Sequence, residues 1–374
     1  MMRQAYLSAP GDELSIREIP IVRPSAGEVL VKINVATVCA GTDLAIMAGL
    51  HPPHDPAVAG MLPHELRLHL GNNVPKPMSE LYPQQGYRGA IFPTTMGHEA
   101  AGTILELGPE ANDPEALAFE GSPLSASDRV ATFQIPGAYG EYSCLPSGNV
   151  VKIPEFMTDE EGSMLEPLLL NYNCLTKCWA LQEPTTVVIL GQGFQGLLAT
   201  QLVRALGAKL IIVSDPLPHK RRFGLEFGAD VALDPRGTNI VHEVERITHG
   251  QGVDLVVECV GIEETVRVLP YLVRRTGMVA QIGAVTTPVT FDYGYIHFKN
   301  FLIMPCDRIM SFRQVAGQVA EIIELIKSKH INLQGLITHR FEFRDINAAF
   351  RLLRDQAEEV VKVAIDVAAP HMSR

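Results

Sequence analysis

The chain has 374 residues, of which 47% are hydrophobic and 20% charged, and its mean hydropathy is +0.12. These values exclude a disordered or membrane-embedded chain, and the length favours two domains. The formal net charge of −11 argues against a nucleic-acid partner, because Lys and Arg are not in excess to neutralise phosphates. We therefore expect small-molecule partners, with neither nucleic acid nor membrane involved.

The cysteines give no sign of a disulfide framework. They are six in number and widely spaced: Cys39, Cys144, Cys174, Cys178, Cys259 and Cys306. The N-terminal stretch "MMRQAYLSAPGDELSI" also lacks the apolar core of a signal peptide. A reducing, cytoplasmic setting is therefore expected.

The first part of the chain, residues 1–158, is rich in short β-branched runs separated by Pro and Gly. This pattern predicts strands with almost no helix, as in a barrel or sandwich-like domain. The runs lie at residues 14–22, 28–38, 100–108 and 128–135. Residues 51–93 are rich in Pro, Gly and His and show no periodicity, and long segments of this kind are usually functional.

From about residue 160 the chain alternates between strand and helix patterns. Buried-type strands such as "TTVVILG" and "LIIVSD" are separated by helical segments such as "FQGLLATQLVRALGA". This alternation predicts right-handed crossovers and an α/β domain with a parallel sheet, over residues 159–298. The remainder, residues 299–374, ends in the strand "VVKVAIDV" and is predicted to return to the first domain.

A dinucleotide site is indicated by "VVILGQGFQG", where Gly191, Gly193 and Gly196 follow a strand and open a helix. The first glycine permits a tight turn, the second lets the backbone approach a pyrophosphate, and the third allows close helix packing. The next strand ends in Asp215, whose carboxylate can bind ribose hydroxyls and would repel a 2′-phosphate. NAD is therefore favoured over NADP, although the basic run at residues 219–222 could receive a phosphate.

Candidate metal ligands lie in three separate segments. Cys39 follows the strand at 28–38, His98 and Glu99 precede the strand at 100–108, and Glu166 lies at a helix start. One thiolate, one imidazole and carboxylates suit zinc with one position left open.

At these motifs the sequence resembles the medium-chain dehydrogenase/reductase superfamily, in particular its zinc-dependent alcohol, polyol and sugar dehydrogenases. The resemblance runs almost from end to end, through "GEVLVKINVATVC", "GHEAAG", "LEPL", "GQGFQG", "VVECVG" and "VVKVAID". It implies a GroES-like β-barrel catalytic domain joined to a Rossmann domain, with a small alcohol or ketone as substrate. A homodimer or homotetramer is also implied.

The resemblance also implies roles for individual residues. Cys39, His98 and Glu166 match the ligands of one catalytic zinc, with Glu99 as a neighbouring or alternate ligand, and Thr42 matches the group that accepts the substrate proton. The lobe with four cysteines that holds a structural zinc is missing. Further cofactor contacts are expected at Phe194, Gln195, Val260, Ile282 and Gly283.

Two departures from the family pattern leave alternatives open. Counting from the upstream strand makes Cys39 the ligand, whereas counting back from "GTD" puts Ala40 in that position; we favour Cys39, because strand register is costly to shift. The long segment 51–93 is unusual, and its histidines could replace or supplement a ligand: His51, His54, His64 and His69.

Three functions are consistent with these motifs. The first is zinc-dependent transfer of hydride between a secondary alcohol and NAD, with zinc lowering the pKa of the substrate hydroxyl. The second is a metal-free quinone or enoyl reductase of the same superfamily, which should lack the His-Glu and Glu-Pro motifs. The third is a nucleotide-binding relative without catalytic activity.

Overall fold

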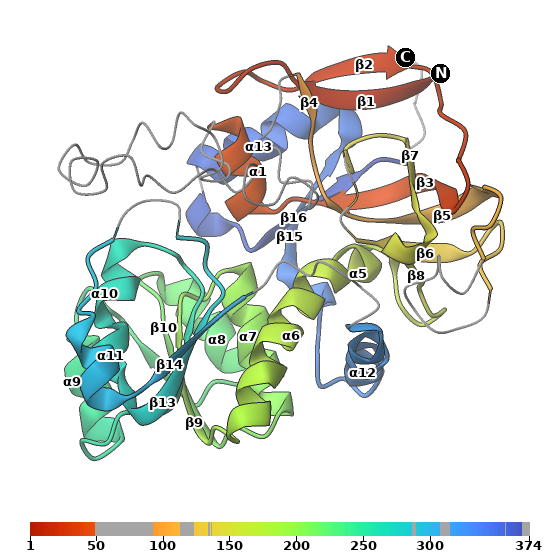
Figure 1. Ribbon diagram of the computed structural model, residues 1–374. Helices are drawn as coiled ribbons and strands as arrows, with labels where there is room; N and C mark the ends of the chain where they lie inside the picture. The colour runs from red at the N-terminus through yellow and green to blue at the C-terminus, as the bar shows by residue number, and fades with distance from the viewer. Residues whose placement is uncertain are drawn as a thin grey trace, which may run out of the picture.

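The computed structural model describes residues 1–48, 93–112, 123–133, 135, 137–285, 289–306, 315–355 and 357–368. The segment 51–93 lies outside these ranges except for its last residue, so the predictions made for it and its four histidines are not addressed by the structure. Figure 1 shows two halves, one built on a parallel sheet and the other on mixed and antiparallel sheets.

The parallel sheet has six strands in the order β11-β10-β9-β12-β13-β14, and every neighbouring pair is parallel. The chain fills one side of β9 first and then the other, so the strand order reverses between β9 and β12. A crevice at the carboxyl ends of such strands is where nucleotides bind. The strands are β9 (Thr186–Leu190), β10 (Leu210–Ser214), β11 (Val231–Leu233), β12 (Val253–Glu258), β13 (Val273–Gln281) and β14 (Leu302–Pro305).

Helices cover both faces of this sheet. Along β9, Val187 and Ile189 join the core under α6 and α7, whereas Val188 and Leu190 join the core under α9 and α10. Alternate residues of a strand point to opposite faces, so a run that is apolar throughout requires cover on both. The helices are α6 (Leu165–Leu181), α7 (Phe194–Ala205), α8 (Pro218–Glu226), α9 (Ile240–Ile247), α10 (Glu263–Leu272) and α11 (Gly294–Lys299).

The other half contains a seven-stranded sheet in which β16 lies antiparallel to β3. Its strands are β3 (Glu28–Thr37), β5 (Glu99–Leu107), β6 (Arg129–Thr132), β7 (Tyr142–Pro146), β8 (Val150–Lys152), β15 (Ile337–Glu342) and β16 (Lys362–Asp366). A smaller sheet pairs β1 (Met2–Leu7) with β2 (Ser15–Ile19) and β4 (Thr94–Thr95). The domain boundaries stay predictions, but the parallel sheet continues through β14, past residue 298.

The remaining helices are α1 (Ala40–Met47), α5 (Asp159–Ser163), α12 (Ala316–Lys327) and α13 (Ile346–Asp355), with short 3-10 turns at Ser147–Asn149, Gln334–Leu336, Phe343–Asp345 and Ala357–Glu359. α1 corrects the expectation of almost no helix in this half. Its only fully buried residue is Asp43, so it has no apolar face that the sequence could reveal. Two helices, α5 and α6, precede the parallel sheet and are separated at Met164.

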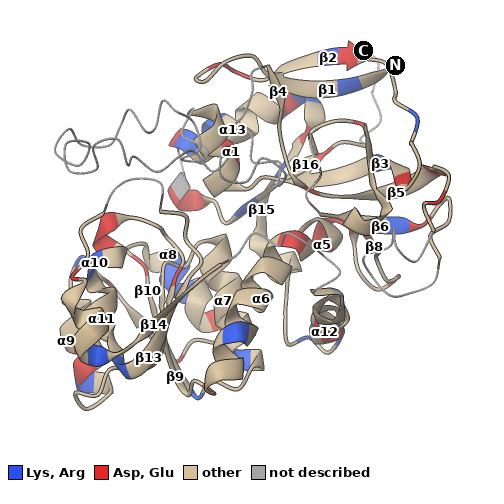
Figure 2. Cartoon of the chain, in the orientation of Figure 1, with Lys and Arg blue, Asp and Glu red and all other residues tan. Residues whose placement is uncertain are grey.

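Charged residues are spread over both halves. Figure 2 shows basic and acidic segments interspersed along the described helices and strands. None of the helices in the described ranges combines the length and apolarity needed to cross a membrane.

Candidate functional site

The three glycines of the dinucleotide motif occupy different environments. Gly191 has φ +86°, and a Cβ there would lie 2.5 Å from a methyl carbon of Val260. A Cβ on Gly196 would lie 1.9 Å from the carbonyl oxygen of Gly191, so the helix packs directly on the turn. Gly193, the N-cap of α7, has open space around it. This combination leaves room for a pyrophosphate at the start of α7.

The carboxylate of Asp215 lies against the same turn. Its two oxygens accept hydrogen bonds from the backbone N–H groups of Gln192 and Leu217, both at 2.8 Å. Each oxygen keeps a further lone pair for a ribose hydroxyl. In the neighbouring basic run, the guanidinium of Arg221 is occupied by Asp215 O at 2.8 Å and by Asp234 at 3.1 Å.

The turns after β12 and β13 are tied together by the buried carboxylate of Glu258. It accepts hydrogen bonds from the backbone N–H groups of Val260 and Gly261 and from the side chain of Gln281, which also donates to Gly283 O. The predicted cofactor contacts Val260, Ile282 and Gly283 therefore lie on two linked turns at one edge of the sheet. In the first turn of α7, the side chain of Gln195 accepts a hydrogen bond from Asn171 of α6.

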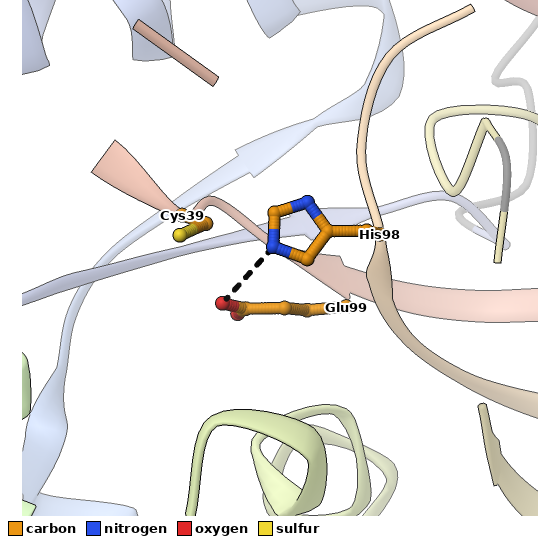
Figure 3. Close-up of side chains that lie close together, drawn as sticks. All are labelled: Cys39, His98 and Glu99. Carbon is orange, nitrogen blue, oxygen red and sulfur yellow. Dashed lines mark ion pairs between the residues drawn. The ribbon is translucent and has the colours of Figure 1, made fainter. Parts of the chain in front are cut away.

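Cys39, His98 and Glu99 form a cluster in which one ligand atom of each residue lies within 4.8 Å of the others (Figure 3). Strand pairing brings them together, because Thr37 at the end of β3 lies opposite Glu99 at the start of β5. Cys39 is the N-cap of α1 and its sulfur faces the cluster, whereas Ala40 is exposed. This placement agrees with the register counted from the upstream strand, in which Cys39 is the candidate ligand.

The two carboxylate oxygens of Glu99 have different environments. Oε2 accepts hydrogen bonds from Thr37 Oγ1 and Lys362 Nζ, both at 2.6 Å. Oε1 is buried without a hydrogen-bond partner, and it lies 3.9 Å from His98 Nε2. A buried carboxylate oxygen without a donor, beside a thiol and an imidazole, is the environment that a zinc ion satisfies.

The other side of His98 faces Asp43, with Nδ1 3.7 Å from Asp43 Oδ1. Burial alone would lower the pKa of His98, but Cys39, Asp43 and Glu166 raise it well above its usual value. The site therefore favours a positive charge at the imidazole, which a metal ion can supply in place of the proton. An imidazole between a metal and a carboxylate is a common arrangement in zinc proteins.

Two further predicted site residues, Glu166 and Thr42, lie outside the cluster of three. Glu166 is buried at the start of α6 and acts electrostatically on His98, although it is not one of the three clustered residues. Thr42 is half-buried in the first turn of α1.

Three further residues at this site are not singled out by the sequence motifs: Asp43, Lys362 and Tyr139. Asp43 was visible as part of "GTD", and Lys362 as the charge within the apolar strand "VVKVAID". A charge in a buried strand usually implies a buried partner, so Lys362 could have been recognised.

Comparisons with known proteins show what the whole chain is similar to. A family model described as "Zinc-binding dehydrogenase" matches residues 196–328. An alcohol dehydrogenase of Cupriavidus necator is 28% identical over 382 aligned residues, covering 98% of both chains. An L-threonine 3-dehydrogenase of Pyrococcus horikoshii is 26% identical, covering 92% of this chain and 93% of the relative.

Among solved structures, an Escherichia coli oxidoreductase/dehydrogenase of unknown specificity superimposes with a TM-score of 0.77 at 23% identity. The match covers 98% of this chain and 99% of that one, and it confirms the predicted fold of a GroES-like domain joined to a Rossmann domain. With its motifs running from end to end and both halves of the fold matched, the chain is similar along its whole length to the zinc-type dehydrogenases of the medium-chain dehydrogenase/reductase superfamily.

Proposed function

We propose that the protein is a zinc-dependent oxidoreductase that transfers hydride between a secondary alcohol and NAD. The observation that carries the proposal is the position of Lys362, which links the two candidate sites. Its ammonium group lies 2.6 Å from Glu99 in the metal-type cluster and 4.0 Å from the ring centroid of Phe194 in the dinucleotide motif. A bound metal and a bound nicotinamide cofactor would therefore be neighbours.

We assign Cys39 Sγ, His98 Nε2 and Glu99 Oε1 as the protein ligands of the metal. Glu166 is the candidate for the fourth position, from which a substrate oxygen would displace it. When bound, the metal supplies a Lewis acid that acidifies a substrate hydroxyl, and the nicotinamide supplies the hydride acceptor. The lone pair of Glu99 Oε1 supports this assignment, because Oε2 is already used by Thr37 and Lys362.

The chain's own residues orient these groups and move the proton. Asp43 holds the backbone N–H of Cys39 at 3.0 Å and faces the imidazole of His98, so it orients two of the three ligands. Thr42, which lies between Cys39 and Asp43 in the sequence, is proposed to accept the proton of the substrate hydroxyl. Thr42 lies in the first turn of α1, which directly follows the N-cap Cys39, so the helix holds both residues close together.

We propose NAD rather than NADP as the cofactor. A 2′-phosphate would have to lie beside the carboxylate of Asp215, and like charges at close range are strongly unfavourable when partly desolvated. Arg221 of the nearby basic run already binds Asp215 O and Asp234.

For the substrate we propose a polyol, a sugar or a similar hydroxylated compound. The two relatives named above act on different hydroxylated molecules according to their names, an alcohol and L-threonine. A panel of secondary alcohols, polyols, sugars and hydroxyamino acids is therefore the appropriate screen.

The proposal is tested by metal analysis of the purified protein followed by that panel with NAD and with NADP. We expect about one zinc per chain, as for a single catalytic site, and reduction of NAD by at least one alcohol. Activity on a polarised C=C bond without metal would favour the quinone or enoyl reductase. Bound nucleotide with no turnover of any substrate would favour a non-catalytic relative.

A further inference from the structure

Tyr139 is a fully buried tyrosine that the sequence motifs do not single out. Its hydroxyl donates a hydrogen bond of 2.5 Å to Asp43 Oδ2, and no part of the residue is exposed. A phenylalanine would fill the same apolar space, so what the tyrosine adds is the hydrogen bond from its hydroxyl to Asp43.

The ring and backbone of Tyr139 hold the turn that carries His98. A Cβ on Gly97 would lie 3.0 Å from the ring carbons of Tyr139, and Gly97 has φ +87°, so the ring rests directly on this turn. Backbone hydrogen bonds of 3.1 Å join Tyr139 N to Met96 O and Ala138 N to Gly97 O. The residue that precedes His98 is therefore fixed on both sides.

The hydroxyl of Tyr139 acts on the turn that carries Cys39. Asp43 Oδ2 accepts hydrogen bonds from Tyr139 and from the backbone N–H of Cys39 at 3.0 Å. The other oxygen, Oδ1, is buried without a hydrogen-bond partner and lies 3.7 Å from His98 Nδ1. With Oδ2 held by two donors, the carboxylate cannot rotate, and Oδ1 remains directed at the imidazole.

Tyr139 is itself held from the core side. Its ring meets the ring of Phe350 edge to face, with centroids 5.8 Å apart, and its carbonyl oxygen accepts a hydrogen bond of 2.9 Å from Ala5 N. These contacts come from α13 and β1, elements that carry no candidate ligand. Tyr139 therefore joins the packed core to both ligand-bearing turns.

We propose that Tyr139 is a positioning residue for the metal site, acting through Asp43 on His98 and through Gly97 on the turn before it. The inference rests on the proposed function, because it concerns metal binding. Without the hydroxyl, Asp43 loses one of the two donors on Oδ2 and gains freedom to rotate away from His98. Loss of such outer partners of a metal ligand typically weakens metal binding by about 10- to 100-fold.

The test compares Tyr139→Phe with Tyr172→Phe, a matched control that removes a hydrogen bond of 2.8 Å to Glu321 between α6 and α12. Zinc affinity is measured by competition with a chromogenic chelator, without substrate or cofactor. We expect about tenfold weaker zinc binding in Tyr139→Phe and no change in Tyr172→Phe. The absorption bands of the cobalt-substituted protein should shift only in Tyr139→Phe, which a purely structural role would not produce.

A second comparison tests the route through Asp43. Asp43→Asn keeps the volume of the side chain and an oxygen for Tyr139, but it can place an amide N–H where His98 needs an acceptor. If Tyr139 acts through Asp43, adding Tyr139→Phe to Asp43→Asn should weaken zinc binding no further. Additive losses would overturn that route.

The outcomes separate this inference from the proposed function. Wild-type protein that fails to bind zinc would refute the proposed function. Wild-type protein that binds zinc, together with unchanged affinity and an unchanged cobalt spectrum in Tyr139→Phe, would refute the role of Tyr139 alone.

Discussion

Lys362 Nζ lies 2.6 Å from Glu99 Oε2, and the side chains of both residues are almost completely buried. Lys362 opens the last strand, β16, whereas Glu99 opens β5, and both strands flank β3 in one sheet. The ion pair therefore places a positive charge behind the candidate metal ligand and beneath the ring of Phe194.

Replacing Lys362 by Met should destabilise the metal-free protein by about 3 kcal/mol, because a buried carboxylate loses its partner. Adding Glu99→Gln should recover part of that loss, since no unpaired charge then remains. Urea denaturation of the single and double variants measures both effects. Lys327→Met is the control, because the ion pair of Lys327 with Glu324 is on the surface and its removal should cost little.

Cys39→Ser should lose most of the bound zinc and most of the activity, because a thiolate ligand is replaced by a hydroxyl. Thr42→Val, three residues along, should keep the zinc and slow turnover, because it removes the proposed proton acceptor and no ligand. Zinc content and kcat of the two variants are the measurements. Unchanged zinc occupancy in Cys39→Ser would show that the sulfur is not a ligand.

Asp215→Asn should narrow the preference for NAD over NADP by about tenfold, the effect of roughly 1.4 kcal/mol of charge repulsion. The amide keeps an oxygen for one of the two backbone donors, so the turn around Gln192 should remain folded. The ratio of kcat/KM for the two cofactors reports the effect. Equal efficiency of the wild-type protein with NADP would contradict the proposed cofactor before any variant is made.

Acid should weaken the contribution of Asp254 to stability. Burial alone would raise the pKa of Asp254, but Arg274 and the donors of Thr185 and Thr186 hold it well below its usual value. A depressed pKa contributes stability above the unfolded pKa of about 3.9, and this contribution is lost as the pH falls towards the folded pKa. Asp254→Asn should therefore be less stable than wild type at pH 7, by about 2 kcal/mol, with the difference shrinking below pH 4. A difference independent of pH would contradict this origin.

The outer edge of β14 should pair with a second copy of the chain. β14 is the last strand of the parallel sheet, its residues Leu302 and Ile303 are 54% and 42% exposed, and Phe298 on the adjacent α11 is 74% exposed. An apolar edge strand without charges readily pairs with another strand. Ile303→Lys should shift the protein from dimer towards monomer in light scattering, whereas Leu181→Lys, at an exposed helix end, should not. A monomeric wild-type protein would contradict the expected pairing.

The parallel sheet could be predicted from the sequence because its signals are local. "VVILGQGFQG" contains the end of a strand, the turn and the start of a helix within ten residues. In the structure its three glycines have different surroundings, and a Cβ would clash at Gly191 and Gly196 but not at Gly193. The helix α1 could not be predicted in this way, since its buried residue is an aspartate held by Tyr139 and by Cys39 N.

The environment of the candidate ligands depends on contacts between distant parts of the chain. The letters around Cys39 allow two registers, and the pairing of Thr37 with Glu99 selects the one in which the sulfur faces His98. Lys362 could be noticed as a charge among apolar residues, but its partner follows only from the pairing of β16 beside β3. Such long-range strand pairings cannot be predicted from any short segment of the sequence.

The antiparallel pairing of β3 with β16 also sets an order for folding during synthesis. All strands of the parallel sheet lie between these two in the sequence, so that sheet can assemble while the ribosome is still translating the last strand. In the other sheet, β7 pairs with Glu28–Lys32 of β3, so only Val35–Thr37 on that edge of β3 stay unpaired until β16 emerges. The nascent chain therefore completes the strand pairing beside Cys39, and the ion pair of Glu99 with Lys362, only at the end of its synthesis.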